Sequence, residues 1–266
     1  MELGLRGKAV LVTGSSKGIG RAIAVAFARE GCQVAINGRH APELEAAADQ
    51  VRAAGGTVHI VVADVTEAEG ARRTVVETVR RFGSIDVLVN NAGGVGRFAA
   101  FEELTDEEWL DVFRLNVLSA VRVTRAALPY MQKQKWGRII NISSESGMQP
   151  DPIMPHYNAS KSALNSLTKS LSKAYGKDGI LVNTVSPAFV RTPLVEDMLQ
   201  QQARARGVSV DEVEQILLRE FRPNIVLGRA GRSEETAGVV VFLASQQASF
   251  ITGSNYRVDG GSVASL

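Results

Sequence analysis

Thr13–Gly20 reads TGSSKGIG and joins an apolar, β-branched run, Lys8–Thr13 (KAVLVT), to the helical pattern of Gly18–Glu30. Glycine adopts positive φ without steric cost and lets a backbone come close to a ligand. The start of the following helix offers unpaired N–H groups and a dipole that favour a pyrophosphate. No GK[ST] sequence follows, and the glycine spacing differs from GxGxxG. The turn therefore predicts a dinucleotide site, although glycines alone could serve packing.

The alternation of strand and helix continues along the chain. We expect strands at residues 33–36, 58–63, 87–89, 137–142, 180–186 and 254–258, and helices at 42–54, 67–82, 106–134, 155–176 and 233–244. Repeated units of this kind favour a parallel sheet covered by helices on both faces, because the crossovers are right-handed. No linker divides the chain, so residues 1–266 are expected to form one α/β domain, a doubly wound Rossmann sheet.

The segment 191–227 breaks this rhythm with a helical stretch rich in Gln, Arg and Glu. It follows the carboxyl end of an expected strand, which is where doubly wound sheets bind ligands. We interpret it as a small helical lid over the substrate. A solvated surface helix or a contact between subunits is the alternative.

Composition restricts the kinds of partner. The net charge is +2 and no block of one sign occurs, so we expect no nucleic-acid binding. Residues 1–7 lack an apolar signal core, no stretch is long enough to span a membrane, and Cys32 is the only cysteine. The expectation is a soluble, cytoplasmic protein with no metal site.

Tyr157 and Lys161 are four residues apart in an expected helix, which places both side chains on one face. The pKa of free tyrosine is about 10, so bringing it near neutrality takes roughly 4 kcal/mol. An ammonium about 4 Å away at an effective dielectric of ~20 supplies energy of that order. A Tyr and a Lys at this spacing are by themselves more often a surface pair than a catalytic one, so the neighbouring motifs must decide.

These motifs together resemble the short-chain dehydrogenase/reductase family. The matching features are TGxxxGxG at 13–20, NNAG at 90–93, YxxxK at 157–161 and VDGG at 258–261, and the resemblance extends from Gly7 to Gly261. It implies four catalytic residues: Asn116, Ser144, Tyr157 and Lys161. Ser144 precedes Tyr157 by 13 residues, which favours it over Ser143 and Ser146. In the family the asparagine holds a water for proton relay, and the serine polarises the substrate carbonyl.

The resemblance also implies the cofactor contacts. These are Gly14, Ser16, Lys17, Gly18, Ile19, Gly20, Arg39, Asp64, Val65, Asn91, Ala92, Gly93, Tyr157, Lys161, Pro187, Val190 and Thr192. The sequence departs from the family at Ala188, where glycine is usual, which raises the question whether the backbone there needs a positive φ.

Two residues predict the choice of cofactor. An NAD enzyme presents an acidic residue after the second strand to the ribose hydroxyls, but Gly38 stands at that position. Arg39 follows it, and Lys17 lies in the glycine-rich turn, so two cations can attract a 2′-phosphate. We expect NADP(H) rather than NAD(H); the alternative is that both cations are ordinary surface charges.

The expected function is hydride transfer between NADPH and a ketone or secondary alcohol, most like the 3-oxoacyl-carrier-protein reductases. Glu145, Met148, Met154 and His156 flank the catalytic positions and are the candidate substrate contacts. An NAD-dependent alcohol or sugar dehydrogenase and a non-catalytic NADPH-binding regulator are the alternatives. The family's long helices form contacts between subunits, so a homotetramer is expected.

Overall fold

Short apolar runs form the strands of one parallel sheet. The computed structural model describes residues 2–265, and within them the sheet has seven strands in the order β3-β2-β1-β4-β5-β6-β7. The strands are β1 (Ala9–Val12), β2 (Gln33–Gly38), β3 (Thr57–Val62), β4 (Val87–Asn90), β5 (Gly137–Ile142), β6 (Ile180–Pro187) and β7 (Asn255–Val258). Every residue of β1, β4 and β5 is buried, as expected of strands covered on both faces.

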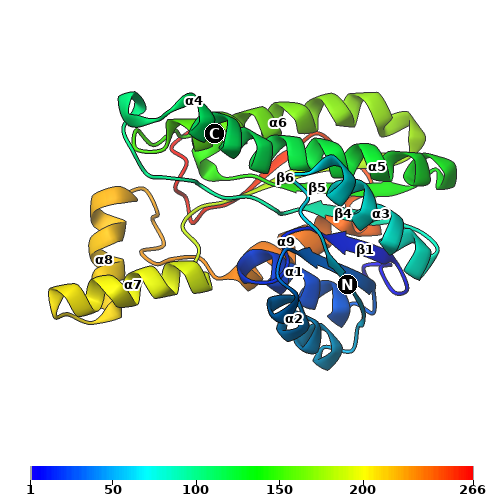
Figure 1. Ribbon diagram of the computed structural model, residues 1–266, viewed down its shortest axis with the longest axis horizontal. Coiled ribbons are helices and arrows are strands. Elements are labelled where there is room, and N and C mark those ends of the chain that lie inside the picture. The colour runs from blue at the N-terminus through cyan, green and yellow to red at the C-terminus, as the bar shows by residue number, and fades with distance from the viewer. Residues whose placement is uncertain (1, 266) are drawn as a thin grey trace.

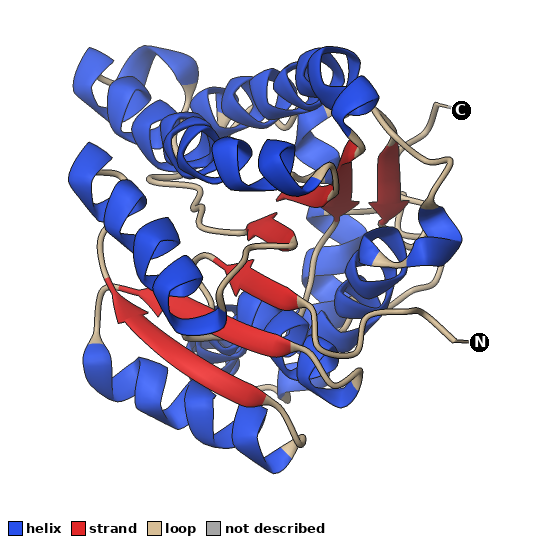
Figure 2. Ribbon diagram, turned by 90° about the vertical axis from the view of Figure 1, so that its right-hand side faces the viewer, coloured by secondary structure: helices blue, strands red, loops and turns tan. Residues whose placement is uncertain are grey.

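Two groups of helices cover the two faces. In Figure 1, α1 (Gly18–Arg29), α2 (Ala41–Ala53) and α9 (Ser233–Ala244) lie below the sheet, and α3 (Ala68–Phe82), α5 (Ser119–Gln134) and α6 (Pro155–Tyr175) lie on its other side. Figure 2 shows the strands between these two layers. Side chains alternate along a strand, so Val10 and Val12 pack into the first core and Leu11 into the second. The predicted doubly wound fold is confirmed.

The strand order creates a crevice at one edge of the sheet. Strand β1 pairs with β2 on one side and with β4 on the other. After β3 the chain therefore crosses β1 to reach β4. The connections that leave β1 and β4 therefore run to opposite faces, and the gap between them is where such sheets bind ligands. The glycine-rich turn after β1 opens at this edge.

The helix predicted at 106–134 is interrupted. The structure has α4 (Asp106–Phe113), a π-helical turn (Arg114–Leu118) and then α5. A π turn inserts one residue into the helical ladder and is frequent at functional sites. This one carries Asn116. Short 3-10 turns that were not predicted occur at Phe101–Glu103, Glu145–Gly147, Gly176–Asp178 and Gln246–Ala248.

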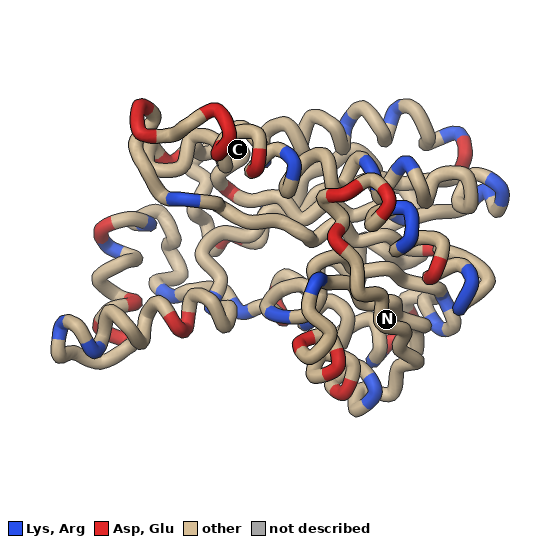
Figure 3. Tube along the Cα trace, in the orientation of Figure 1, with Lys and Arg blue, Asp and Glu red and all other residues tan. Residues whose placement is uncertain are grey.

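The segment 191–227 forms two helices, α7 (Pro193–Arg206) and α8 (Val210–Phe221), which project from the body of the molecule (Figure 1). They have a small core of their own, in which Leu199, Ala203 and Val213 are buried. Residues of both charge signs lie along the pair, as they do over the rest of the trace (Figure 3). Among residues 2–265 no helix is long and apolar enough to cross a membrane.

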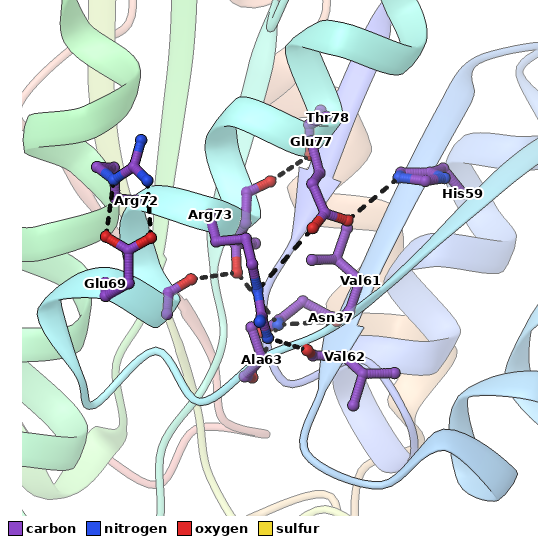
Figure 4. A network of polar contacts seen from close by, with 12 residues as sticks. Asn37, His59, Val61, Val62, Ala63, Glu69, Arg72, Arg73, Glu77 and Thr78 are labelled. Atoms are coloured by element: carbon purple, nitrogen blue, oxygen red, sulfur yellow. Dashed lines mark hydrogen bonds and ion pairs between the residues drawn. The ribbon is translucent and has the colours of Figure 1, made fainter.

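A buried amide fastens the end of β2 to its neighbours (Figure 4). The Asn37 side-chain amide donates to the carbonyl oxygens of Val61 at 3.1 Å and Ala63 at 3.0 Å, and it lies 3.4 Å from the Thr74 hydroxyl on α3. Asn37 is 1% exposed, so water cannot replace these bonds. The amide therefore holds the carboxyl ends of β2 and β3 together beneath α3.

Replacing Asn37 with Ala should destabilise the fold. The Asn37→Ala change leaves two buried carbonyl oxygens without their donor, and we expect the free energy of unfolding to fall by about 1–3 kcal/mol. Urea unfolding followed by circular dichroism measures it. Asn224 is exposed, so Asn224→Ala is the matched control and should change little. Equal stability of the two variants would contradict this account of Asn37.

Candidate active site

The glycine-rich turn is packed against the chain that follows β4. Gly14 has φ +60° and Gly18 has φ +54°, both in the left-handed region. A Cβ at Gly14 would lie 2.8 Å from the Cα of Ala92, so only glycine fits this approach. The Asn91 amide donates to the carbonyl oxygens of Thr13 at 3.0 Å and Gly14 at 2.8 Å. The two segments predicted to bind the cofactor are therefore joined directly.

Helix α1 begins at this turn with its amide groups available. Lys17 is the N-cap residue, and its side chain makes no capping hydrogen bond. Gly20 is buried, and a Cβ there would collide with the Asn91 side-chain amide. The glycine backbone and the first-turn N–H groups of α1, which have no side-chain cap, suit a pyrophosphate, because a helix amino terminus attracts anions. Ile19 is half-buried beside them.

The expected adenosine end contains a carboxylate that the sequence interpretation missed. Glu43 of α2 accepts from the Lys17 ammonium at 2.8 Å and from the Ser16 hydroxyl at 3.3 Å. The bond from Lys17 lowers the pKa of Glu43. An acid in the first turn of the helix after β2 was the available signal, since that turn faces the glycine-rich loop. Arg39 is exposed, and within residues 2–265 it has no ion pair.

The predicted adenine contacts follow the third strand, which ends at Val62. Val65 is buried. Asp64 is half-buried, and its carboxylate accepts from the backbone N–H of Thr66 at 2.9 Å and the Thr66 hydroxyl at 2.7 Å. These bonds fix the turn from β3 into α3, so Asp64 has a structural role whether or not it contacts a ligand.

Tyr157 and Lys161 project from the first turns of α6 toward the end of β5. The Lys161 ammonium donates to the carbonyl oxygen of Ile142 at 2.9 Å and lies 5.6 Å from the centroid of the Tyr157 ring. Lys161 is 4% exposed, and burial lowers its pKa to about 8. A buried ammonium with a single carbonyl partner is a reactive arrangement, because its charged form is poorly solvated.

The tyrosine differs from the expectation in one respect. Burial raises the pKa of Tyr157, and the hydrogen bond with the Ser144 hydroxyl opposes this shift. A lowered pKa was expected; in this structure burial has the larger effect, and the Lys161 ammonium donates to the Ile142 carbonyl. Ser144 itself is 8% exposed. In this geometry the Tyr157 phenol is paired with the Ser144 hydroxyl.

Asn116 is buried in the π turn, and three hydrogen bonds hold its side-chain amide. The amide nitrogen donates to the Gly94 carbonyl and to the Ser160 hydroxyl, both at 2.9 Å, while its oxygen accepts from the Gly94 N–H at 2.9 Å. A Cβ at Gly93 would lie 2.9 Å from the Asn116 amide oxygen and 3.3 Å from the Lys161 ammonium. Gly93 therefore allows Asn116 and Lys161 to approach each other.

The predicted nicotinamide segment lies beside the glycine-rich turn. Pro187 ends β6, and Val190 forms a bridge with Gly231. The Thr192 hydroxyl accepts from the Val195 N–H at 3.4 Å and caps α7, and the Thr192 methyl would contact a Cβ at Gly18 at 3.3 Å. Among the described non-glycine residues only Lys135 has positive φ, so alanine at position 188 requires no strained backbone.

The four predicted substrate contacts differ in exposure. Met148 is 36% exposed, whereas Glu145, Met154 and His156 are buried. His156 packs against the Trp109 ring, and Glu145 forms an ion pair with Arg222 at 3.2 Å. In this conformation only Met148 presents its side chain to solvent. Arg222 was missed, because nothing in its local sequence indicates a partner far away along the chain.

Taken together, the glycine-rich turn, the segment after β4, the end of β5, the start of α6 and the exit of β6 meet at one edge of the sheet. The glycine positions 14 and 20, where a side chain would not fit, and the open amino terminus of α1 suit the binding of a dinucleotide. Beside it stand a phenol, a hydroxyl and a buried ammonium, which are groups suited to donating a proton and binding a carbonyl oxygen.

Comparisons with known proteins agree with this geometry. The family model described as short chain dehydrogenase matches residues 8–203. The crystal structure of L-sorbose reductase from Gluconobacter frateurii, complexed with NADPH and L-sorbose, is 36% identical with a TM-score of 0.94, and each chain is covered completely.

Two curated relatives show the range of activities. The 3-oxoacyl-[acyl-carrier-protein] reductase of Thermotoga maritima is 36% identical over 97% of this chain and 99% of its own. The D-beta-hydroxybutyrate dehydrogenase of Rhizobium meliloti is 35% identical over 96% of this chain and 98% of its own. With the family match covering most of the chain and these relatives nearly all of it, the chain belongs to the short-chain dehydrogenase/reductase family of oxidoreductases.

Proposed function

We propose that this enzyme transfers a hydride between NADPH and a ketone or secondary alcohol and works as a ketone reductase. The observation that carries the proposal is the grouping of Tyr157, Ser144 and Lys161 beside the glycine-rich turn. Relatives that reduce L-sorbose and 3-oxoacyl thioesters support it. A non-catalytic regulator would not need a buried ammonium held next to a half-buried phenol.

Each group has a role in the reduction. The nicotinamide, when bound, supplies the hydride. Tyr157 donates a proton to the substrate oxygen as the general acid, and Ser144 binds the same oxygen and stabilises its developing charge. Lys161 stabilises the phenolate that remains. The side-chain amide of Asn116 is already bonded, so this residue would contribute to the proton relay through its main-chain groups in the π turn. Gly14, Gly18 and Thr192 hold the cofactor.

We further propose that α7 and α8 act as a lid over the substrate, that the enzyme is a homotetramer and that it works in the cytoplasm. The lid hypothesis is supported by its attachment through Thr192, which stands beside the glycine-rich turn. The buried thiol of Cys32, the only cysteine, is compatible with a reducing compartment.

Tyr157→Phe tests the function directly. Turnover should fall by about 10²–10⁴-fold, because the general acid is lost, while the NADPH dissociation constant stays the same. We would follow NADPH absorbance with acetoacetyl-CoA and L-sorbose as substrates, and NADPH binding by fluorescence titration. Tyr175 lies at the far end of the same helix, so Tyr175→Phe is the control. Full turnover in Tyr157→Phe would remove the assignment.

The cofactor preference depends on three side chains. Arg39 is exposed and available to a 2′-phosphate, whereas the Lys17 ammonium must leave Glu43 to reach one. The Glu43 carboxylate would also repel the phosphate. We therefore propose that NADPH is preferred and that Glu43 weakens the preference. This carboxylate is the feature that favours the alternative, an NAD-dependent dehydrogenase.

Two substitutions should move the preference in opposite directions. Arg39→Gln should weaken NADPH binding about tenfold or more, since a bond to a charged group contributes roughly 1.5–3 kcal/mol, and should leave NADH binding nearly unchanged. Glu43→Gln should tighten NADPH binding. Titration with both cofactors and with 2′-AMP measures this, and Arg52→Gln on the same α2 helix is the control. NADH binding tighter than NADPH in the wild type would favour the alternative.

Lys161 should cost stability below its own pKa. The folded pKa, about 8, lies below the ordinary 10.5, so the unfolded chain binds more protons between these values and stability rises with pH across that window. At pH 7 the full cost applies. Lys161→Met should therefore raise the free energy of unfolding there by about 1–3 kcal/mol, with the gain shrinking at alkaline pH, while activity is lost.

Thermal and urea unfolding of wild type and Lys161→Met at a series of pH values would measure this. Lys173, exposed on the same helix, provides the control substitution Lys173→Met. A Lys161→Met protein that is less stable than wild type at neutral pH would show that the bond to Ile142 outweighs the burial of charge.

A further inference from the structure

One arginine joins the projecting helices to the catalytic region. Arg222 directly follows α8, and its guanidinium reaches two carboxylates at once: Nε lies 3.2 Å from an oxygen of Glu145, and Nη1 lies 2.6 Å from an oxygen of Asp151. The side chains are 23%, 6% and 15% exposed, respectively. Removing one partner of an ion pair this well shielded from water is costly, because the other charge is left buried without a counter-ion.

Glu145 is held from several directions. Burial raises its pKa, and the charges of Asp259 and Asp151 add to the shift, while the charge of Arg222 opposes it. The segment that carries Ser262 is tied to the same loop, because the Gln149 amide donates to the Ser262 carbonyl at 3.1 Å. The carboxylate thus stands where the end of the chain, the loop after β5 and the end of α8 meet.

Glu145 is linked to the proposed catalytic groups through two neighbouring residues, Ser144 and Gly147. Ser144 precedes it, and the Ser144 hydroxyl accepts from the Ser146 N–H at 3.2 Å, so the turn 145–147 orients that hydroxyl. Gly147 packs on α6: a Cβ there would lie 2.9 Å from the carbonyl carbon of Lys161. A shift of Glu145 would therefore move the turn that sits between Ser144 and Lys161.

We propose that Arg222 is a positioning residue: through its ion pair with Glu145 and Asp151, it couples the placement of α7 and α8 to the orientation of Ser144 and the charge balance around Tyr157. The inference rests on the proposed ketone reductase function. It adds that the helices over the substrate are fixed by a charge contact with the loop that carries the catalytic serine.

The charges give this coupling a distinct signature. The Glu145 carboxylate raises the pKa of Tyr157, and the Arg222 guanidinium lowers it. Ketone reduction needs the protonated phenol, so its rate falls as the pH rises through this pKa. Without Arg222 the carboxylate is uncompensated, and the alkaline limb of the pH profile should move to higher pH. Without the Glu145 charge the limb should move to lower pH.

Four variants separate charge from geometry. Arg222→Gln removes the cation and its contacts with the two carboxylates, whereas Arg222→Lys keeps a cation but loses the planar group that contacts both. Glu145→Gln removes the carboxylate charge. Arg219→Gln, at an exposed position of α8, is the control. We would measure single-turnover NADPH oxidation across neutral and alkaline pH, with the panel ketone that the wild-type enzyme reduces, together with KM and hydrogen exchange in α8.

The expected outcomes differ between variants. In Arg222→Gln, KM should rise about tenfold and the alkaline limb should move up by about one pH unit, the size expected for a nearby charge in a poorly solvated site. Arg222→Lys should keep the limb near its wild-type position while KM still rises, and Glu145→Gln should move the limb down. Exchange in α8 should accelerate in Arg222→Gln but not in Arg219→Gln.

The proposal is overturned if Arg222→Gln and Arg219→Gln share the same KM and the same limb. It is also overturned if Arg222→Lys and Arg222→Gln shift the limb equally, which would leave only a structural role. Should Arg222→Gln fail to fold, Arg222→Lys and Glu145→Gln still decide the charge argument. Retained turnover in Tyr157→Phe would instead refute the proposed function, so the two failures are distinguishable.

Discussion

The site depends on the contact between the glycine-rich turn and the chain after β4. Asn91 binds the carbonyl oxygens of Thr13 and Gly14, and the approach is so close that no side chain fits at position 14. This contact closes one end of the crevice at the switch point of the sheet and leaves the amino terminus of α1 open. Everything that would hold a dinucleotide is arranged around it, because the strands on either side are buried and rigid.

A second constraint is the burial of the Lys161 ammonium, which forms no ion pair with a carboxylate of residues 2–265. Lys161 follows Tyr157 by one helical turn, and within residues 2–265 the one hydrogen-bond partner of its ammonium is a strand carbonyl. A protein selected only for stability would fill this position with an apolar side chain. The retained charge fits the proposed reaction, in which the phenol would lose its proton and a neighbouring cation would become favourable.

Much of the fold and part of the site followed from the sequence for physical reasons. Strand and helix periodicities are local, so the strand at 137–142 and the helix at 233–244 were predicted with the bounds that the structure gives. The π turn was not predicted, because one inserted residue barely disturbs the hydrophobic spacing of a long helix. Glu43 had a local signal in its first-turn position. Arg222 had none, since its carboxylate partners are more than 70 residues away and only the folded chain brings them together.

The π turn at Arg114–Leu118 is equivalent to the insertion of one residue into an otherwise continuous α-helix. Removing a single residue there would restore an uninterrupted α-helix, and it would also rotate everything on its amino-terminal side by about 100° about the axis. The chain that reaches this helix from β4 would then arrive out of register. A shortened homologue would therefore have to lose a second residue in the preceding loop or re-route it, so length changes on the two sides of position 114 should be inherited as a pair.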